Sequence, residues 1–419
     1  MVTGMREMKD SGVEWMKKIP LSWKTIRFRY LHTSSNVGDS VDKSQYSNDE
    51  EGHVFYMAGK EPITTSYESF PAWKYTNHHD LLMARNGTPY VYLPVENAVY
   101  SDHVIRVDIK KGYDRRYVRY CLQQSIEAEV VETVSIPTWS ISLWDEQNIP
   151  VPPFHEQCHV ADFLDSKCAE IDALSADIQS EIDTLEAYKR SVITEAVTKG
   201  LDKNAPMKDS GIEWVGEIPA TWKMLRGKYI FEQKSDRGNT KSLILLSPTQ
   251  NYGVIPQELY EELSGFSAVK LNEKINLNSL KTVHKGAFVI SLRSFQGGFE
   301  YSEYEGVVSP AYQVFYPTIS VYDGYYKYLF KTQIFIDKMN SYTMSLRDGK
   351  NIAFADFGRT YIPVPPVSEQ RAIAEYLDSM CADLNEIVAQ KQKQLDVLAD
   401  YKKSIIYEYV TGKKEVPVA

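Results

Sequence analysis

Two long stretches of the chain, residues 156–199 and 369–411, carry apolar residues at steps of three and four and contain no proline or glycine. That period places the apolar side chains on one face of an α-helix. Proline pairs at 152–153 and 365–366 mark where each helix begins, because a residue that precedes proline avoids the helical conformation. In the first stretch the recurring apolar residues are Ile171, Leu174, Ile178, Ile182, Leu185, Tyr188 and Val192.

Helices of this length are only marginally stable in isolation, so each must bury its apolar face on another part of the protein. The heptad-like spacing predicts that the two helices pack on each other as a two-stranded coiled coil. The alternative is that each helix lies on its own globular domain.

The segments that precede each helix have a different pattern. Their apolar runs are short, rich in β-branched and aromatic residues, and bounded by turn residues, which is typical of β-strands. The clearest runs are Asp80–Ala84, His103–Val107, Ala287–Ser291 and Tyr312–Tyr316. The chain therefore alternates a β-rich segment with a long helix twice, and we predict an α+β protein.

The sequence also repeats itself. Residues 8–31 match residues 207–230 without a gap, at an offset of 199 and with 13 of 24 positions identical. A second match, at an offset of 213, relates IPVPPFHEQCHVADFLDSKCAEID from Ile149 to IPVPPVSEQRAIAEYLDSMCADLN from Ile362. A duplicated frame around unlike middle segments indicates one scaffold that carries two different binding domains.

A weaker match, at an offset of 208, aligns Arg85 with Arg293 and Tyr117 with Tyr325. We therefore expect the two middle segments to share one fold. The tryptophans of the repeated opening occur in both halves, so they cannot distinguish one half from the other, and we expect them to serve packing. These are Trp15, Trp23, Trp214 and Trp222.

The two ends of the chain resemble the connection between its halves. Joining the last residues, VTGKKEVPVA, to the first, MVTGMREM, recreates a segment similar to VTKGLDKNAPM at 197–207. The repeat therefore predicts a closed, pseudo-two-fold arrangement in which the two ends lie close together.

The net charge of −9 argues at first against a nucleic-acid-binding protein. However, residues 156–199 contribute −6 and residues 369–413 contribute −2, so the rest of the chain is near neutral. Total charge therefore does not exclude a local basic surface that binds DNA. The chain has no apolar run near the roughly 20 residues that span a bilayer and no apolar stretch typical of a secretory signal, so we expect a cytoplasmic protein of about two to four domains.

The four cysteines have no C-x-x-C spacing, and we interpret them as reduced packing residues. His155, Cys158 and His159 could face one metal ion on a helix. The matched positions of the second copy are Ser368, Arg371 and Ala372, which favours an ordinary polar start of a helix. We predict no metal site.

Four motifs, each present twice, resemble those of the specificity (S) subunits of type I restriction–modification systems. They are KDSG-x-EW-x-x-x-IP-x-x-W, IPVPP-x-x-EQ, LD-x-x-C-A and Y-K-[RK]-S-[VI]-I-x-E-x-VT. The resemblance implies two globular mixed α/β target recognition domains, separated by two long antiparallel helices that form a coiled coil. We expect the domains at 1–153 and 201–366, the first helix at 154–200, and the second helix with a C-terminal tail at 367–419.

The same resemblance implies a function. Each recognition domain would read one half of a bipartite, asymmetric double-stranded DNA target. Two modification (methyltransferase) subunits and the restriction (motor/nuclease) subunits would bind the repeated frame, and these partners would carry S-adenosylmethionine, ATP and Mg. The chain itself would bind no cofactor and catalyse no reaction, and it contains neither a G-x-x-x-x-G-K-[ST] phosphate loop nor an Asn-Pro-Pro-Tyr/Phe motif. The alternative is a two-module protein-interaction scaffold on a coiled-coil strut that does not recognise DNA.

Candidate DNA-binding residues are polar side chains in loops, because base edges are read by hydrogen-bond donors and acceptors. Gly87 and Pro89 predict a loop after the first strand, and the matching place in the second domain follows the strand at 287–291. The candidates in the first domain are Lys74, Asn77, Arg85, Asn86, Thr88 and Tyr90. Those in the second domain are Lys234, Arg237, Asn251, Tyr252, Arg293, Ser294 and Gln296.

Overall fold

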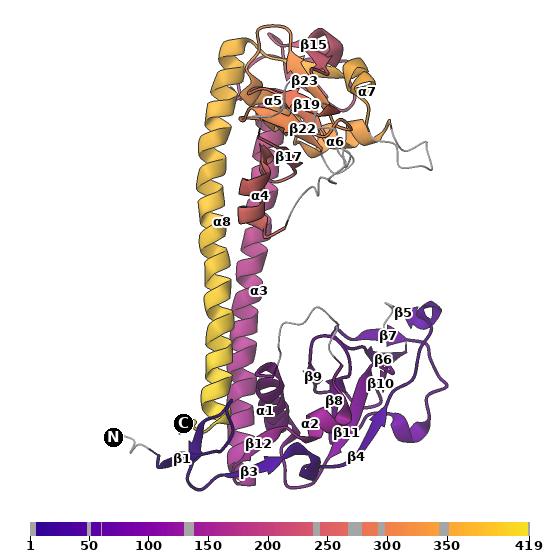
Figure 1. Ribbon diagram of the computed structural model, residues 1–419, viewed down its shortest axis with the longest axis vertical. Coiled ribbons are helices and arrows are strands. Elements are labelled where there is room, and N and C mark those ends of the chain that lie inside the picture. The colour runs from indigo at the N-terminus through magenta and orange to yellow at the C-terminus, as the bar shows by residue number, and fades with distance from the viewer. Residues whose placement is uncertain are drawn as a thin grey trace. The chain divides into compact units, whose positions relative to one another are not determined.

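The computed structural model describes residues 6–47, 52–59, 61–129, 138–237, 244–266, 279–291, 298–342 and 352–417. The chain divides into two units (Figure 1). Unit 1 consists of Met1–Gln179 together with Lys393–Ala419, and unit 2 consists of Ser180–Gln392. Each unit therefore contains one β-rich segment and a part of both long helices.

Within its described residues, unit 1 has two four-stranded sheets. The first has the order β4-β11-β8-β9 and is antiparallel throughout, and the second has the order β10-β6-β7-β5 with β10 parallel to β6. The strands of these sheets are β4 (His32–Val37), β5 (Tyr46–Ser47), β6 (His53–Tyr56), β7 (Ile63–Thr65), β8 (Asp80–Ala84), β9 (Val91–Tyr92), β10 (Val99–Tyr100) and β11 (Val104–Ile109). Two-stranded ribbons and short helices complete the unit: β1 (Met8–Asp10) with β2 (Lys18–Pro20), β3 (Lys24–Arg27) with β12 (Asn148–Val151), α1 (Arg115–Glu127), α2 (Ile141–Asp145), η1 (Phe28–Tyr30), η2 (Lys43–Gln45) and η3 (Ala72–Lys74).

Unit 2 has one four-stranded antiparallel sheet in its described residues, with the order β16-β23-β20-β21. Its strands are β16 (Phe231–Lys234), β20 (Phe288–Ile290), β21 (Phe299–Tyr301) and β23 (Gln313–Pro317). The two-stranded pairs are β13 (Met207–Asp209) with β14 (Glu217–Pro219), β15 (Lys223–Arg226) with β24 (Tyr361–Val364), β17 (Leu246–Thr249) with β18 (Gly253–Pro256), and β19 (Lys281–Val283) with β22 (Gly306–Val308). The short helices are η4 (Gly227–Tyr229), α4 (Gln257–Ser264), α5 (Asp323–Leu329), α6 (Gln333–Asn340) and α7 (Phe354–Arg359).

The two central sheets are the same sheet in two copies. Strands β4, β11, β8 and β9 correspond in sequence position and in order to β16, β23, β20 and β21. The four strands expected from the sequence are β8, β11, β20 and β23, each within two residues of the predicted bounds. The prediction that both middle segments share one fold is confirmed for this central sheet.

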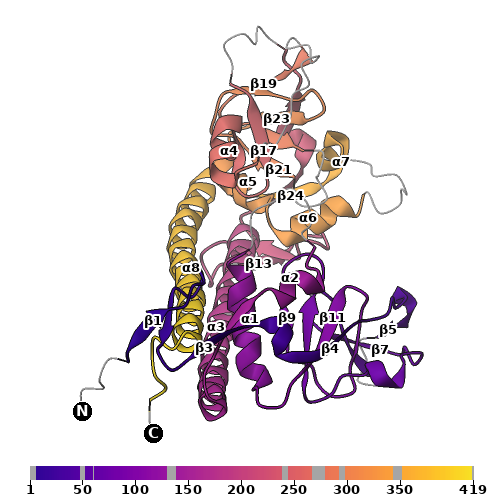
Figure 2. The same cartoon turned by 60° about the horizontal axis from the view of Figure 1, so that its bottom comes forward.

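The two predicted long helices are also confirmed. They are α3 (Phe154–Lys199), with 46 residues, and α8 (Val367–Val410), with 44 residues. Within each unit, its segment of α3 lies beside its segment of α8 (Figures 1 and 2). The alternative in which each helix lies only on its own globular domain is therefore wrong.

The contacts between the helices establish that they run antiparallel. In unit 1 the ring of Phe163 lies 4.4 Å from that of Tyr409, and the Lys402 ammonium binds the Asp172 carboxylate at 2.6 and 2.7 Å. In unit 2 Lys391 pairs with Glu181. As residue numbers rise on α3 they fall on α8, so the C-terminal part of each helix packs against the N-terminal part of the other.

One of these contacts occurs twice under the sequence repeat. Lys189 corresponds to Lys402 and Asn385 corresponds to Asp172 at the offset of 213. The Lys189 ammonium donates to the Asn385 amide oxygen at 2.6 Å, in the same geometry as the Lys402–Asp172 pair. The helix pair therefore has internal pseudo-two-fold symmetry.

The buried seam between the helices is narrower than the apolar stripe that the sequence predicts. Leu174 and Tyr188 on α3 are 49% and 56% exposed, and their repeat mates Ile387 and Tyr401 on α8 are 41% and 53% exposed. The seam uses a smaller set of residues at steps of three and four, and on α3 these include Leu164, Cys168, Ile171, Ile178 and Ile182. Apolar side chains therefore stay exposed at matched positions of α3 and α8.

Two matched tyrosines attach each β-rich segment to the end of the helix from the other repeat. The hydroxyl of Tyr117 donates to the carbonyl oxygen of Val410 at 3.1 Å, at the end of α8. The hydroxyl of Tyr325 donates to the carbonyl oxygen of Val197 at 2.6 Å, near the end of α3. Helix termini leave carbonyl groups without intrahelical partners, and these buried hydroxyls satisfy them.

Hydrogen bonds explain the presence of the glutamine of the IPVPP-x-x-EQ motif in both copies. Gln157 accepts from the Asp114 backbone N–H at 3.0 Å and donates to the Pro152 carbonyl at 2.9 Å. Gln370 accepts from the Tyr322 N–H at 2.7 Å and donates to the Pro365 carbonyl at 2.8 Å. A buried amide with both of its ends bonded fixes the start of the long helix against the neighbouring short helix.

The repeated opening packs on the C-terminal ends of the long helices. Gly412 follows α8 with a φ of +66°, and a Cβ there would lie 2.5 Å from Pro20 and 2.9 Å from Trp23. Gly200 follows α3 with a φ of +77°, and a Cβ there would lie 3.4 Å from Trp222. Glycine is the residue that takes this left-handed conformation and leaves room for the ring. Trp23 and Trp222 are fully buried, which confirms the packing role expected for them.

The two ends of the described chain meet inside unit 1. The Arg6 guanidinium binds the Glu415 carboxylate at 3.0 Å, pairs with Glu156 and lies 5.5 Å from the ring of Trp23. This confirms the expectation that the ends lie close together.

We expect a circular permutant to fold like the parent chain. Its new ends would lie between Lys203 and Asn204 in the exposed connection after α3, and a short glycine–serine linker would join residue 417 to residue 6. Because the Arg6–Glu415 contact already holds that junction, the thermal midpoint of unfolding should stay within about 4 °C, equivalent to about 1 kcal/mol. The control is a permutant cut between Gln179 and Ser180 in the middle of α3, which should unfold at a clearly lower temperature. Equal losses in the two permutants would contradict the prediction.

Candidate nucleic-acid interface

The loop between β8 and β9, residues 85–90, holds four of the candidate residues of unit 1. Arg85, Thr88 and Tyr90 are exposed, and Asn86 is half-buried. Gly87 has a φ of +76°, which a glycine adopts without strain, so the chain turns sharply at this point. The loop therefore presents a guanidinium, a hydroxyl and a phenol to solvent within a few residues.

This loop is held in place by two other segments. The Arg85 N–H donates to the His103 carbonyl at 2.8 Å, and the Arg85 guanidinium donates to the Asp102 carbonyl at 3.3 Å. The Asn86 amide lies 2.7 Å from Nδ1 of His103. On the other side, the Trp139 indole donates to the Gly87 carbonyl at 2.7 Å. A loop fixed in this way can hold polar side chains in one geometry, as sequence readout requires.

His103 belongs to the same group, although the sequence pattern placed it at the start of a strand. The strand β11 begins one residue later, at Val104, so His103 lies in the preceding turn with its side chain 60% exposed. An imidazole has one donor and one acceptor in its neutral form, so it suits a base edge. The turn residues Ser101 and Asp102 that precede it were the signal in the sequence that could have indicated this position.

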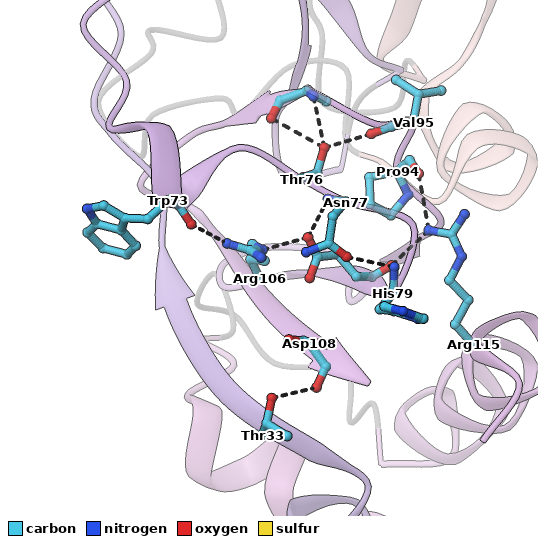
Figure 3. Close-up of polar contacts among 12 residues, drawn as sticks. Thr33, Trp73, Thr76, Asn77, His79, Pro94, Val95, Arg106, Asp108 and Arg115 are labelled. Carbon is cyan, nitrogen blue, oxygen red and sulfur yellow. Dashed lines mark hydrogen bonds and ion pairs between the residues drawn. The ribbon is translucent and has the colours of Figure 1, made fainter. Parts of the chain in front are cut away.

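Lys74 and Asn77 form intramolecular contacts. The Lys74 ammonium binds the Asp39 carboxylate at 2.6 Å and lies 5.6 Å from the ring of Phe70 and 5.7 Å from that of Trp73. The Asn77 side chain accepts from the His79 N–H at 2.7 Å and shapes the turn before β8 (Figure 3). These side-chain contacts of the two residues do not involve the 85–90 loop.

A buried ion pair supports this side of the sheet. The Arg106 guanidinium donates to the Asp80 carboxylate at 2.7 Å and to the Trp73 carbonyl at 2.8 Å (Figure 3). Burial raises the pKa of the Asp80 carboxyl, while the bonds from Arg106 and from the Asn77 N–H oppose that change. Breaking such a pair by removing one partner is costly, because the other charge stays buried. The pair thus ties the start of β8 to β11 and, through the Trp73 carbonyl, to the segment at residue 73.

The corresponding loop of unit 2 connects β20 to β21, the strands that match β8 and β9. Arg293, Ser294 and Gln296 lie in this loop at 292–297, outside the described residues. Its two flanks are paired, with the Ser291 N–H donating to the Gly298 carbonyl at 2.8 Å. A similar bond closes the loop of unit 1, from the Ala84 N–H to the Tyr90 carbonyl at 2.9 Å. Both candidate loops therefore occupy the same position in the same fold.

The other candidates of unit 2 fall into two separate surroundings. Lys234 ends β16, with its ammonium 5.7 Å from the ring of Tyr316, and Arg237 follows as an exposed residue. Burial lowers the pKa of the neighbouring Lys281, and the charge of Arg237 lowers it further. Asn251 and Tyr252 form the turn between β17 and β18 and line a groove instead.

This groove has a volume of about 610 Å³ and lies between β17–β18, α5, α3 and α8 within unit 2. Three lysines line it, one each from α3, α5 and the turn after α5, together with several tyrosines and the buried Glu300. The Lys331 ammonium binds Oε1 of Glu300 at 2.6 Å, while Oε2 has no hydrogen-bond partner among the described residues. Burial raises the pKa of Glu300 to about 7, although Lys331 opposes the rise.

The described residues contain no group of three His, Cys, Asp or Glu side chains that could hold a metal ion. No helix in the described part of the chain is long and apolar enough to cross a membrane.

Comparisons with known proteins agree on one family. The profile of the family described as "Type I restriction modification DNA specificity domain" matches residues 219–397. The type I restriction enzyme MjaVIII specificity subunit of Methanocaldococcus jannaschii is 23% identical over 99% of this chain and 99% of its own length. The type I restriction enzyme EcoBI specificity subunit of Escherichia coli is 23% identical over 47% of this chain and 43% of its own.

A solved structure described as "Structural basis underlying complex assembly and conformational transition of the type I R-M system" is similar in fold. It aligns with a TM-score of 0.65 and 14% identity, over 94% of this chain and 99% of that chain. The similarity extends over both repeats, as the internal duplication requires.

Replacing Glu300 by glutamine is expected to change how stability depends on pH. The folded pKa of about 7 lies above the usual 4.5, so the carboxyl favours the folded state most at low pH. That contribution is lost as pH rises through about 7. Glutamine stays neutral at every pH. The free energy of unfolding of Glu300→Gln minus that of the parent should therefore rise between pH 5 and 8, by on the order of 3 kcal/mol.

Urea unfolding at several pH values measures this difference. The matched control is Glu303→Gln, an exposed residue of the same groove, whose difference from the parent should stay constant over the range. A constant difference for Glu300→Gln as well would contradict the raised pKa.

Proposed function

Because the chain belongs to the family of type I restriction–modification specificity subunits, we propose that it reads a bipartite, asymmetric DNA sequence for a methyltransferase and nuclease complex. Each β-rich segment is the reader of one half-site. The recognition domains extend over 1–153 and 201–366, and the helices over 154–200 and 367–419 form the frame between them.

The observation that supports this proposal best is the pair of matched loops. Residues 85–90 and 292–297 connect equivalent strands of one duplicated sheet, yet their sequences, RNGTPY and LRSFQG, differ. Both contain arginine with amide or hydroxyl side chains, which are the groups that bind base edges. One fold with two different loops is what an asymmetric, split target requires, because identical readers on a two-fold frame would bind a palindrome.

The helix pair is the frame that sets the spacing between the half-sites in this proposal. A helix of 46 residues is about 69 Å long, and its partner supports it by burying the shared seam. The exposed apolar residues at matched positions of α3 and α8, such as Leu174 and Ile387, form a surface that is offered twice. Exposed apolar surface is typical of a protein interaction site, so two copies of a modification subunit would bind there.

In this proposal the chain is not catalytic. S-adenosylmethionine, ATP and Mg would belong to the modification and restriction subunits, and the assembled complex would carry adenine-N6 methylation and ATP-dependent cleavage. The role of the chain is to position those subunits on DNA, by contacts to bases and to phosphates.

Mapping methylated adenines in the host genome, with the gene present and deleted, tests the proposed function. A single gapped, non-palindromic motif should lose its methylation on deletion and regain it when the gene is restored. The control is a strain that lacks only the modification subunit, which should lose the same motif. Unchanged methylation in a host where the modification subunit is expressed would contradict the proposal.

Arg85→Ala should weaken recognition of one half-site and leave the other unchanged. Loss of a bidentate contact to a base costs about 1–3 kcal/mol and relaxes preference at that position. The measurement is the affinity of the assembled complex for a DNA panel in which each base pair of the target is substituted in turn. Arg293→Ala is the matched variant and should affect only the other half-site. If either change relaxed both halves equally, the two readers would not be independent.

A further inference from the structure

The repeated opening, residues 8–31 and 207–230, ends in a segment with several basic residues. Ion pairs within the chain do not account for these residues. In unit 1 this segment is Lys24–Tyr30, which comprises β3 and η1, and in unit 2 it is Lys223–Tyr229, which comprises β15 and η4. Each strand pairs on one side only among the described residues, β3 with β12 and β15 with β24. We refer to these two segments as the basic ribbons.

Each basic ribbon has three cationic side chains at matched positions. They are Lys24, Arg27 and Arg29 in unit 1 and Lys223, Arg226 and Lys228 in unit 2. Within the described part of the chain, these six side chains form no ion pair, in contrast to Lys74, Arg106 and Arg116, which all do. Six cations that the fold does not neutralise are available to an anionic ligand.

One acidic side chain on each helix that packs on a ribbon is already paired. Helix α2 packs on η1, and its Asp145 carboxylate lies 2.7 Å from Nε2 of His32. Helix α7 packs on η4, and its Asp356 is paired with Arg359. These two carboxylates therefore form no ion pair with the ribbon cations.

Each ribbon ends in an exposed tyrosine beside a cation. Tyr30 is 57% exposed and Tyr229 is 58% exposed. The Arg29 guanidinium lies 5.7 Å from the ring of Tyr30, and the Lys228 ammonium lies 5.1 Å from the ring of Tyr229. A cation beside an exposed phenol thus occurs at the same position in both copies, as arginine in one and lysine in the other.

The repeat makes it possible to separate this feature from ordinary surface charge. Lys17 and Lys18 have been replaced by Gly216 and Glu217 in the second copy, so surface cations of the opening are not generally retained. Lys9 is retained as Lys208, and each has an intramolecular role, donating to the carbonyls of Leu21 and Ala220. The side chains of the ribbon cations form no hydrogen bond or ion pair among the described residues, and only Arg226 lies over a ring from outside its own ribbon, 5.2 Å from that of Tyr361.

We propose that the basic ribbons bind the sugar–phosphate backbone of DNA, one ribbon at each half-site, an inference that rests on the proposed function. A feature shared by both halves cannot encode the difference between half-sites, so it must contact something that both half-sites have in common. Phosphates meet this condition, and lysine, arginine and tyrosine are their usual partners. A second shared partner is the modification subunit, but the apolar residues left exposed on α3 and α8 suit a protein surface better than three unpaired cations do.

The test measures DNA affinity of the complex with modification subunits as a function of salt concentration. The variant Lys24→Gln/Arg27→Gln/Arg29→Gln removes one ribbon, and Lys223→Gln/Arg226→Gln/Lys228→Gln removes the other. Each lost phosphate contact lowers the slope of log affinity against log salt by about 0.9, so each triple variant should lower it by up to about 2.7. Preference among target sequences should stay unchanged, in contrast to the effect of Arg85→Ala.

The matched control is Lys17→Gln/Lys18→Gln, which removes cations that the second copy has not retained. Its slope should equal that of the parent. An unchanged slope for both triple variants, with the complex still assembled, would overturn the inference. Failure of the variants to assemble with the modification subunits would also overturn it, because the ribbons would then be a protein interface. If the proposed function itself were wrong, the parent complex would show no sequence-specific DNA binding, a result distinct from both of these.

Discussion

The structure depends on one constraint: two helices of more than 40 residues must each bury an apolar face, and each finds its partner in the other. A long amphipathic helix gains most of its stability from tertiary packing rather than from its own hydrogen bonds. The antiparallel pairing brings the C-terminal part of each helix to the β-rich segment of the other repeat. That is why Tyr117 reaches Val410 and Tyr325 reaches Val197.

The duplicated frame has diverged where packing allows it and has been retained where contacts are specific. Phe28 and Trp144 are fully buried in unit 1, and their repeat mates in unit 2 are Gly227 and Phe357. A Cβ on Gly227 would lie 3.1 Å from the ring of Phe357, so that ring fills the space the missing side chain leaves. The buried glutamines and the tyrosines at the helix ends have not changed, because their hydrogen-bond geometry has no equivalent substitute.

Much of the fold was predictable from periodicity and from the repeat. The step of three and four located both long helices within two residues, and apolar runs located the central strands of both sheets. The width of the helix seam was not predictable, because Leu174 and Tyr188 have the spacing of core residues but lie outside the contact. Only the position of the partner helix decides which part of an apolar stripe is buried.

The candidate site was predictable in part. Loop 85–90 has the exposed polar side chains that its glycine and proline indicated. His103 was not found, because it is next to Asn86 in space and not in sequence. Lys74 was expected as a candidate for phosphate contact, and the structure adds that its ammonium is paired with Asp39. Partners contributed by distant segments decide which polar residues stay available.

The division of the chain into units bears on how it folds during synthesis. Unit 2 is one continuous segment, whereas the core of unit 1 includes Ile405, Tyr409 and Val410 near the end of the chain. The first part of unit 1 leaves the ribosome early and cannot complete its core until the last turns of α8 emerge. Unit 2 can therefore finish folding first. Until translation ends, the nascent chain exposes the apolar surface of unit 1 that α8 later covers. Chaperones protect such surfaces during this interval.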